Sequence, residues 1–548
     1  MTPAGRVRRT AGIVLTVLAA VVVYAALVLP REFAQLTPAA FVRIPVEALV
    51  GVALLLVLPR RVRLIAAALG GAVLGVLTLF KALDMGFLSV LERPFDPVFD
   101  WVLFGNAREF VAGSFGPAAA VAAAVAAVVL ALAVVVLLTL AALRLSRLLD
   151  GHRSGATRGV AVLAVAWLAC LTLGAQLAPP VPVAARSAAA LAYEKARQVP
   201  VSLHDEREFA AQSAEDAFRG VPDADLLTGL RGKDVVLTFV ESYGRSAVED
   251  PRYAPTIAPL LDAGTARLAA AGYGARSGWL TSPVAGGGSW LAHSTFHSGL
   301  KIDNEQRYRS LVSSDRLTVS AAFARSGFET TTVMPATNRA WPEGAYFGFQ
   351  QVHDGPSLGY RGPNFSFSPM PDQYALAQYE RLEHGRADRG PQFAQVELTS
   401  SHVPWTPFPK LVGWDAVGDG SVFASQVEGA EPADQVWKDD DRVRAVYRDS
   451  TAYSLEALIS YVERYGDDDL VLVCLGDHQP QSLITGGDGA THDVPIVIVA
   501  KDKGVLDRIS GWNWDAGLRP SHGAPVWPME AFRDRFLTAF GPGAKLPA

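Results

Sequence analysis

A serine at the end of a glycine-rich turn has the setting that best suits covalent chemistry. The stretch Ser282–His293 reads SPVAGGGSWLAH, and the residues from Ser289 onward are typical of a helix. A hydroxyl at a helix N-terminus lies beside free backbone N–H groups and the positive end of the helix dipole, which favour an anion. Glycines let the backbone approach a tetrahedral oxyanion closely. Ser289 is therefore the candidate nucleophile, and a flexible glycine turn capped by this serine is the alternative interpretation.

Acidic and histidine residues stand at the ends of three apolar runs elsewhere in the chain. A carboxylate or imidazole at one strand end is usually a solvated or structural group, but several at separate strand ends of one sheet are harder to dismiss. In chain order they are Glu241 after Asp234–Val240, His402 after Phe393–Leu398, and Asp477 and His478 after Leu470–Leu475.

This residue set predicts a metal-assisted reaction. Carboxylates with one imidazole suit Mn2+, Mg2+ or Zn2+. A metal held by Glu241, Asp477, His478 and the Ser289 oxygen would lower the pKa of that hydroxyl and neutralise a phosphate oxygen. His402 would then be free to donate a proton to the leaving group or to stabilise the transition state.

The elements that position these residues alternate between strands and helices. Continuous apolar strands separated by helices indicate a mostly parallel α/β sheet covered by helices on both faces, and such sheets bind ligands beyond the carboxyl ends of their strands. The strands predicted besides those above are Thr330–Met334 and Val494–Ala500, and the helices are Ile257–Ala271 and Asp440–Tyr465.

The chain before Ala178 is predicted to be an α-helical membrane domain of five spans. Each apolar segment is near the roughly 20 residues that a span requires. Arginine clusters precede the first span and separate spans two from three and four from five. Because basic loops stay on the cytoplasmic side of a membrane, the N-terminus and these two loops are predicted to be cytoplasmic, and everything after Ala178 is predicted to be outside. The predicted spans are Ala11–Leu29, Ala39–Leu58, Leu64–Leu83, Pro117–Leu143 and Gly159–Ala178.

The predicted organisation is a transmembrane domain over 1–178, a linker over 179–233 with an exposed helix at Ala184–Gln198, and an extracellular catalytic domain over 234–548. A formal net charge of -5 suggests no nucleic-acid partner. The two cysteines, Cys170 and Cys474, both lie in apolar segments far apart, so no disulfide is expected. The aromatic residues of the external loop Asp84–Gly116 suit an interfacial segment that holds a lipid substrate or packs under the soluble domain.

Several of these motifs resemble those of lipoteichoic acid synthase-type enzymes, which belong to the alkaline phosphatase/sulfatase superfamily. The motifs are Glu241-Ser242, Gly286-Gly287-Gly288-Ser289, Ser400-Ser401-His402 and Gly476-Asp477-His478, and the five-span topology with an external sulfatase-like domain also matches.

The resemblance implies roles for individual residues. One divalent metal, usually Mn2+, would be bound by Glu241, Ser289, Asp477 and His478, and His402 would be a substrate-site histidine. Ser289 stands where many members have threonine, which keeps the hydroxyl. Substrate-binding residues are expected at Asn338, Arg339 and Trp341, which lie in the region that contacts the substrate headgroup. His492 departs from the single-metal pattern of the family; it is also expected at the substrate site, as a group behind the metal ligands or a ligand of a second metal, and an ordinary loop histidine is the alternative.

The leading hypothesis is a membrane-anchored phosphotransferase. Ser289 would take a phospho-polyol group of the phosphoglycerol type from a membrane phospholipid and pass it to a glycan or polymer of the cell envelope. One alternative is a hydrolase of phosphate or sulfate esters, although the sulfatase motif is absent because no arginine follows Ser282-Pro283 at the required place. The other alternative is a non-catalytic relic of the fold that binds envelope components.

Overall fold

The protein, seen here in a computed structural model, is described over residues 3–179, 181–365, 367–487 and 490–542, and it forms two compact units. The first unit is Met1–Asp205 and the second is Glu206–Ala548. The division falls within the predicted linker and inside a helix, α6 (Ser187–Ala214), which is longer than the one predicted at Ala184–Gln198.

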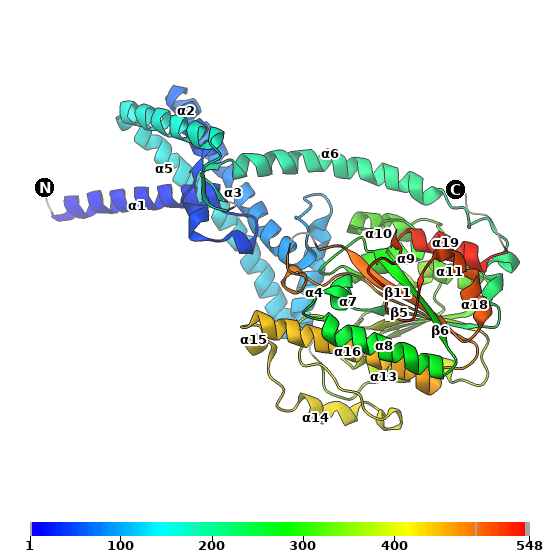
Figure 1. The fold of residues 1–548 in the computed structure, drawn as a ribbon. Coiled ribbons are helices and arrows are strands. Elements are labelled where there is room, and N and C mark those ends of the chain that lie inside the picture. Colours follow the sequence, from blue (N-terminus) through cyan, green and yellow to red (C-terminus); the bar gives the residue numbers. More distant parts are fainter. Residues whose placement is uncertain (1–2, 180, 366, 488–489, 543–548) are drawn as a thin grey trace. The chain divides into compact units, whose positions relative to one another are not determined.

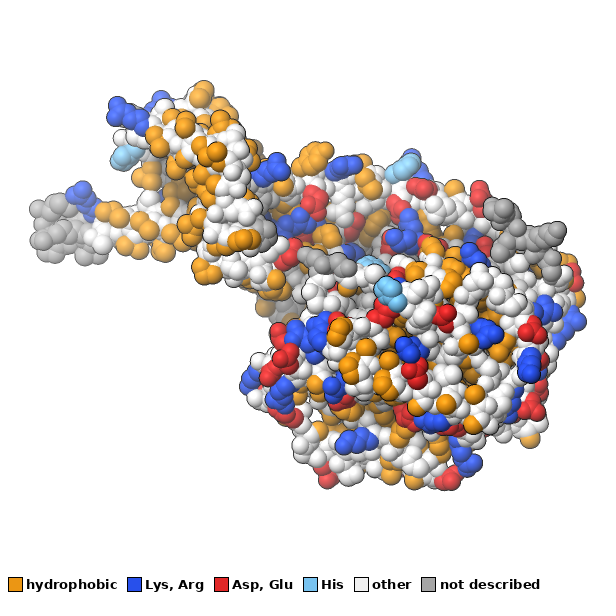
Figure 2. All heavy atoms as spheres, in the orientation of Figure 1, with side chains coloured by type: hydrophobic (Ala, Val, Ile, Leu, Met, Phe, Trp, Pro, Cys, Tyr) orange, Lys and Arg blue, Asp and Glu red, His pale blue; other side chains and the backbone are white. Residues whose placement is uncertain are grey.

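The first unit consists mainly of apolar helices (Figure 1). Figure 2 shows hydrophobic side chains over much of its surface. Leu130 is 66% exposed and Val165 is 70% exposed, and such broad exposure of apolar side chains is typical of a surface that meets lipid. The helices are α1 (Pro3–Val28), α2 (Val46–Val57), α3 (Arg60–Leu91), α4 (Leu103–Phe115) and α5 (Pro117–Thr172).

The structure does not confirm the prediction of five membrane spans. In the part of the first unit that the structure describes, three helices, α1, α3 and α5, are long and apolar enough to cross a membrane. The predicted span Ala39–Leu58 contains the 12-residue α2, and its first part is occupied by a 3-10 helix that ends at Phe41 and by the short strand β1 (Ile44–Pro45). The predicted fourth and fifth spans join in α5, whose 56 residues would extend about 84 Å if straight, but non-helical backbone at His152 (φ −134°, ψ 26°) divides it.

Two glycines on α3 allow it to pack closely against α5. A Cβ on Gly71 would lie 2.7 Å from the Cα of Thr139, and a Cβ on Gly75 would lie 2.7 Å from the Cα of Val135. The two glycines are four residues apart and therefore share one helix face. This Gly-x-x-x-Gly spacing is a common way for membrane helices to bring their backbones together.

The second unit is built on a sheet of nine strands, with β5 near its centre. Strands β10, β5, β9, β7 and β8 run parallel in that spatial order, while β11 is antiparallel to both β10 and β6. The strands are β5 (Asp234–Val240), β6 (Gly274–Thr281), β7 (Glu329–Met334), β8 (Gln351–Asp354), β9 (Gln392–Leu398), β10 (Leu470–Gly476), β11 (Asp493–Ala500), β12 (Asp515–Ala516) and β13 (Val526–Pro528).

Helices cover both faces of this sheet (Figure 1), as the apolar strands predict. Alternate residues of β5 belong to two different apolar clusters, and all seven are buried. One face packs against α8 (Ala254–Ala270), α13 (Asp372–Tyr379) and α16 (Asp440–Tyr465), and the other packs against α9 (Ser289–Ser298), α11 (Val319–Arg325) and α19 (Ala531–Phe540). The shorter helices are α7 (Arg245–Glu249), α10 (Glu305–Val312), α12 (Gly344–Phe347), α14 (Ala424–Val427), α15 (Ala433–Val436), α17 (Ser482–Thr485) and α18 (Lys503–Arg508).

The five predicted strands all form within one residue of their expected limits. The prediction missed the short strands β8, β12 and β13, and it also missed the eight-residue β6. This strand contains Gly274 and Gly278 and lacks a continuous apolar run. A Cβ on Gly274 would lie 2.6 Å from Leu506 Cδ1, and a Cβ on Gly278 would lie 2.7 Å from the indole nitrogen of Trp514. The two glycines interrupt the apolar pattern by which a strand is predicted, and in the structure they make room for the side chains that pack on this strand.

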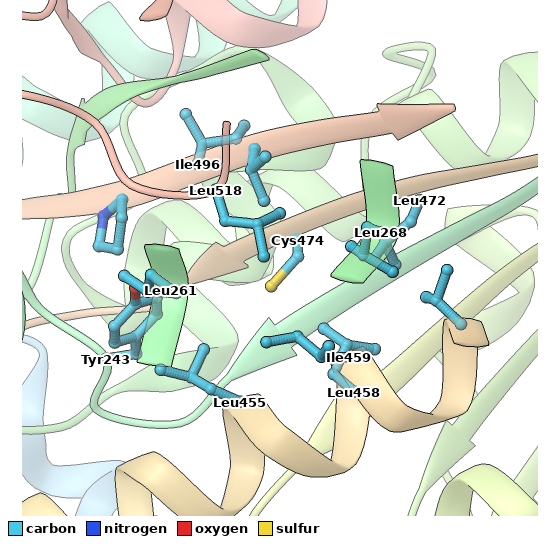
Figure 3. A pocket seen from close by; sticks show the side chains of 13 residues that line it. Tyr243, Leu261, Leu268, Leu455, Leu458, Ile459, Leu472, Cys474, Ile496 and Leu518 are labelled. Atoms are coloured by element: carbon cyan, nitrogen blue, oxygen red, sulfur yellow. The ribbon is translucent and has the colours of Figure 1, made fainter. Parts of the chain in front are cut away.

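A small apolar cavity lies inside the unit, between the sheet and the helices α8 and α16 (Figure 3). Its lining includes Leu261, Leu458, Leu472 and the buried thiol of Cys474. These side chains offer nothing with which to bind a charged or polar substrate. The cavity is therefore part of the core, and the polar chemistry of the unit lies elsewhere.

Candidate functional site

The parallel register of β5 and β10 brings Glu241 and Asp477 together. Val240 is paired with Gly476 at the carboxyl ends of these strands, so the residues that follow them enter the same edge of the sheet. Gly476 is required for this approach, since a Cβ there would lie only 1.8 Å from the carbonyl oxygen of Tyr243. The sheet edge is thus the place where the predicted metal-type residues meet.

Ser289 begins α9 and points into this group. Its Oγ donates a hydrogen bond to Glu241 Oε2 at 3.0 Å and lies 3.2 Å from His478 Nε2. The same Nε2 is 3.3 Å from Glu241 Oε1 and 3.6 Å from Asp477 Oδ2. Four residues from three distant segments therefore direct their polar atoms at a common centre.

These separations fit the donor shell of a metal ion. One donor atom from each of Glu241, Asp477 and His478 lies within 4.8 Å of the other two. Ligand atoms about 2.1 Å from a tetrahedral metal are about 3.4 Å from one another, close to the distances within this cluster. Two carboxylates, one imidazole and one hydroxyl suit Mn2+, Mg2+ or Zn2+.

Backbone groups fix the orientation of two of the donors. Asp477 Oδ1 accepts hydrogen bonds from the N–H groups of Ser242, at 2.8 Å, and His478, at 2.7 Å, which leaves Oδ2 to face the centre. His478 Nδ1 lies 2.8 Å from Gln479 O, so Nδ1 carries a hydrogen and Nε2 is the ring nitrogen that faces the cluster. Ser242 has a φ of 56°, an uncommon conformation for a residue other than glycine, at the point where its N–H meets Asp477.

The glycine-rich turn is attached to the end of β10. Gly286 donates its N–H to Gln479 O at 2.8 Å, and Ser282 Oγ donates to Asp477 O at 2.7 Å. Gly286 (φ 73°) and Gly288 (φ 88°) both adopt left-handed conformations, which glycine tolerates without strain. The turn thus delivers Ser289 to the cluster, and Ser282 is a positioning residue that the sequence analysis considered only for a sulfatase motif.

The charges in the cluster shift the pKa values of its members. Burial alone would raise the pKa of Glu241, but His402 and His478 hold it below its usual range. Burial, together with the charge of Glu241, raises the pKa of Asp477 to about 6. Burial would lower the pKa of His478, yet Asp477 and Glu241 outweigh it and raise this pKa to about 9. Negative charge therefore predominates, as a cation site requires.

His402 follows β9, the strand on the other side of β5. Its imidazole stacks on Phe367, with ring centroids 3.8 Å apart. Its Nδ1 lies 2.5 Å from Val403 O, so Nδ1 carries the hydrogen and Nε2 is the atom for proton exchange. The preceding Ser401 donates its hydroxyl to Glu241 O at 2.6 Å, which ties the end of β9 to that of β5.

The predicted substrate-binding residues lie at the same sheet edge but at separate positions. Asn338 and Arg339 are exposed in the loop after β7. Trp341 is partly buried and stacks on Phe347, with ring centroids 5.4 Å apart. His492 is exposed just before β11, and its backbone oxygen accepts a hydrogen bond from Ser282 at 3.0 Å. Their role in binding a substrate stays a prediction.

A histidine on α9 packs next to the residues of the site. His293 lies one turn after Ser289 and stacks on Phe239, with ring centroids 3.9 Å apart. Its Nδ1 is 3.5 Å from Glu397 Oε1, and its electrostatic effect offsets a small part of the rise in the pKa of Asp477. Glu397 was not singled out in the sequence; the available signal was a charged residue inside an otherwise apolar strand.

Comparisons with known proteins gave similarities only at the level of solved structures. No family model and no curated protein matches the chain. The lipoteichoic acid synthase LtaP from Listeria monocytogenes is similar at 15% identity and a TM-score of 0.39, covering 58% of this chain and 74% of that one.

Two further structures give values in the same range. The periplasmic domain of EptC from Escherichia coli, in complex with Zn, is similar at 11% identity and a TM-score of 0.37, covering 58% of this chain and 88% of that one. The Streptococcus pyogenes phosphoglycerol transferase GacH, in complex with sn-glycerol-1-phosphate, is similar at 12% identity and a TM-score of 0.33, covering 61% and 90%. At these values the activity has to be argued from the geometry of the site.

Proposed function

We propose that this chain is a membrane-anchored, metal-dependent phosphotransferase. It moves a phospho-polyol group of the phosphoglycerol type from a membrane phospholipid, through an ester on Ser289, to a hydroxyl of an envelope glycan or polymer. The observation that carries this proposal is the position of the Ser289 hydroxyl, 3.0 Å from Glu241 Oε2 and 3.2 Å from His478 Nε2 at the start of α9. A serine with a purely structural role would not have to lie next to a carboxylate and an imidazole of this kind.

Glu241, Asp477 and His478 would hold the metal together with Ser289. A bound divalent cation would lower the pKa of the serine hydroxyl and neutralise charge on the phosphate. Mn2+ is the proposed ion, and Mg2+ or Zn2+ fits the same donors. The first turn of α9 offers backbone N–H groups and the positive end of the helix dipole to the phosphoryl oxygens.

The reaction proceeds in two halves. In the first, deprotonated Ser289 Oγ bonds to phosphorus while the bond between phosphorus and the diacylglycerol oxygen breaks, and His402 donates a proton to that oxygen. In the second, the acceptor hydroxyl bonds to phosphorus, the Ser289 ester bond breaks, and His402 takes the acceptor's proton. The serine oxygen leaves as the alkoxide with which the first half began, and His402 is protonated again, so the enzyme returns to its starting state.

The apolar first unit supports a membrane location, which this donor requires. We place the N-terminus in the cytoplasm and the second unit outside, because arginine clusters flank the apolar segments on one side. A tag after Ala548 should then be labelled on intact spheroplasts, whereas a tag before Arg6 should not. Labelling of the N-terminal tag would contradict this orientation and would put the site in the wrong compartment.

The reaction type is tested with the full chain in detergent, Mn2+ and phosphatidylglycerol. We expect release of diacylglycerol and a mass increase on the peptide that contains Ser289, both absent from a Ser289→Ala variant. Aryl sulfates should be cleaved little under the same conditions, because the formylglycine motif of sulfatases is absent. Brisk aryl sulfate cleavage without phosphodiester turnover across several headgroups would replace this proposal with a hydrolase.

A further inference from the structure

A second group of metal-type residues lies at the amino ends of the strands, the opposite edge of the sheet from Ser289. Asp234 is the first residue of β5, and Asp467 lies in the turn before β10. His384 ends the π-helical turn η7 (Glu380–His384), which leads toward β9. One donor atom from each of Asp234, His384 and Asp467 lies within 4.8 Å of the other two.

The imidazole of His384 points into this group from the buried side. Its side chain is 5% exposed, with Nε2 3.9 Å from Asp234 Oδ2 and 4.0 Å from Asp467 Oδ2. Nε2 is buried and has no hydrogen-bond partner among the residues that the structure describes. Because an unpaired buried nitrogen costs free energy, a ligand is expected to bind Nε2.

The other ring nitrogen is held as in a metal-binding histidine. His384 Nδ1 lies 2.8 Å from Glu380 Oε2, which also accepts a hydrogen bond from the Tyr461 hydroxyl at 3.0 Å. A carboxylate on Nδ1 fixes the ring and makes Nε2 a better electron-pair donor, and this arrangement recurs behind metal-bound histidines.

Both aspartates turn Oδ2 toward His384, and Asp234 Oδ2 also accepts a hydrogen bond from Arg389 at 2.8 Å. Asp467 Oδ1 accepts the N–H groups of Asp469 and Leu470, each at 3.0 Å, and this leaves Oδ2 turned toward His384. Asp234 forms two 2.8 Å hydrogen bonds with Arg389, whose guanidinium keeps the carboxylate in place. Asp467 is 50% exposed, so an ion from solvent can reach the group.

The charges favour a divalent cation. Asp234, Glu380 and Asp467 supply three negative charges, and Arg389 supplies one positive charge against them. The excess of two negative charges matches one divalent ion. Two further buried polar groups beside this cluster, the Tyr379 hydroxyl and the Gln392 side-chain amide, also have no hydrogen-bond partner within the described ranges.

We propose that Asp234, His384 and Asp467 form a second, structural cation site. An imidazole with two carboxylates suits Zn2+, whose preferred coordination number leaves one position for water on the Asp467 side. The ion would join the amino ends of β5 and β10 to the turn before β9, three segments that are distant in the sequence. It is remote in the sheet from Ser289 and has no part in the transfer reaction.

The test measures Zn2+ bound to the full chain in detergent, by mass spectrometry of the metal and by titration. Asp477→Asn is used as the background so that the site at Ser289 contributes less. Adding Asp467→Asn removes one charged ligand, while its amide oxygen can still accept the N–H groups of Asp469 and Leu470. The matched control is Asp468→Asn, a neighbouring carboxylate that is 92% exposed and pairs with Lys501.

We expect Asp467→Asn to weaken Zn2+ binding at least tenfold, with the loss of one equivalent at limiting metal. Zn2+ should also raise the Tm of the background protein, and this rise should disappear with Asp467→Asn but persist with Asp468→Asn. Equal Zn2+ affinity with and without Asp467→Asn would overturn the proposal. So would an absence of bound Zn2+ in the background, which would mean that His384 is simply a protonated partner of Glu380.

Discussion

Replacing Asp477 by asparagine should remove the metal from the site at Ser289 while leaving its local backbone in place. The carboxylate has one oxygen, Oδ1, fixed by the N–H groups of Ser242 and His478 at 2.8 and 2.7 Å. An asparagine must keep its carbonyl oxygen there, because the opposite orientation would set an NH2 group against two N–H donors. The NH2 group therefore takes the place of Oδ2, where it has no lone pair to offer a cation.

The expected loss of affinity can be estimated from the lost charge. Two unit charges 4 Å apart at an effective dielectric constant of 20 interact by about 4 kcal/mol. A divalent ion would lie closer to Asp477 than this, and part of the gain is offset by the desolvation of the buried carboxylate. About 4 kcal/mol corresponds to a thousandfold weaker Kd, which we take as the expected change.

The assay is a titration with Mn2+ followed by the electron paramagnetic resonance signal of the free ion. The full chain is used in detergent, and Asp467→Asn is present in every sample so that the proposed second site does not contribute. Asp493→Asn is the control, since Asp493 is a buried carboxylate at the same sheet edge that bonds Thr281 and Arg245. A Kd within tenfold of the parent protein for Asp477→Asn, or an equal loss for Asp493→Asn, would refute the assignment.

Three further predictions concern neighbouring positions. Ser289→Ala should reduce diacylglycerol release by several orders of magnitude without lowering the Tm. Ser289→Thr should retain measurable turnover because it keeps the hydroxyl. Comparable rates for the alanine variant and the parent protein would exclude Ser289 as the nucleophile. Burial lowers the pKa of His297 from 6.5 to about 4. Between these pH values the unfolded chain binds more protons than the folded one, so the free energy of unfolding falls by about 3 kcal/mol as the pH drops through this range. This component should be missing from the pH dependence of Tm in His297→Gln, and identical profiles for the two proteins would contradict it. Gly476→Ala should destabilise the second unit by about 3 kcal/mol, because the new Cβ would overlap the Tyr243 carbonyl oxygen 1.8 Å away; an unchanged Tm would show that the strand end can adjust.

The sequence by itself was sufficient to predict the strands that carry the site. β5 and β10 are continuous apolar runs, and runs of this kind form buried strands because no other local structure suits them so well. The polar residues that end these runs, Glu241 and Asp477, had to share an edge once the strands were parallel. The glycine-rich turn could also be predicted from the sequence, because glycine readily adopts the left-handed conformations found at Gly286 and Gly288.

The membrane segments were predictable in composition, whereas the predicted number of five is not confirmed. Hydropathy identified the apolar stretches, yet it cannot show where a helix breaks or continues. The structure joins two predicted spans in α5 with a break at His152, and it reduces another to α2. Helix continuity depends on packing between helices, such as the close approach of α3 and α5 at Gly71 and Gly75, and that packing is not a local property of the sequence.

Only the tertiary structure decided which polar residues meet. His293 and Glu397, which support the site, lie in different elements and contact each other only because α9 packs on the face of β9. Trp341, which is predicted to contact the substrate headgroup, stacks on Phe347. The group of Asp234, His384 and Asp467 spans more than two hundred residues and has no common motif. Local pattern determines which strands and turns form, whereas strand order and register, set by long-range packing, determine which side chains share a site.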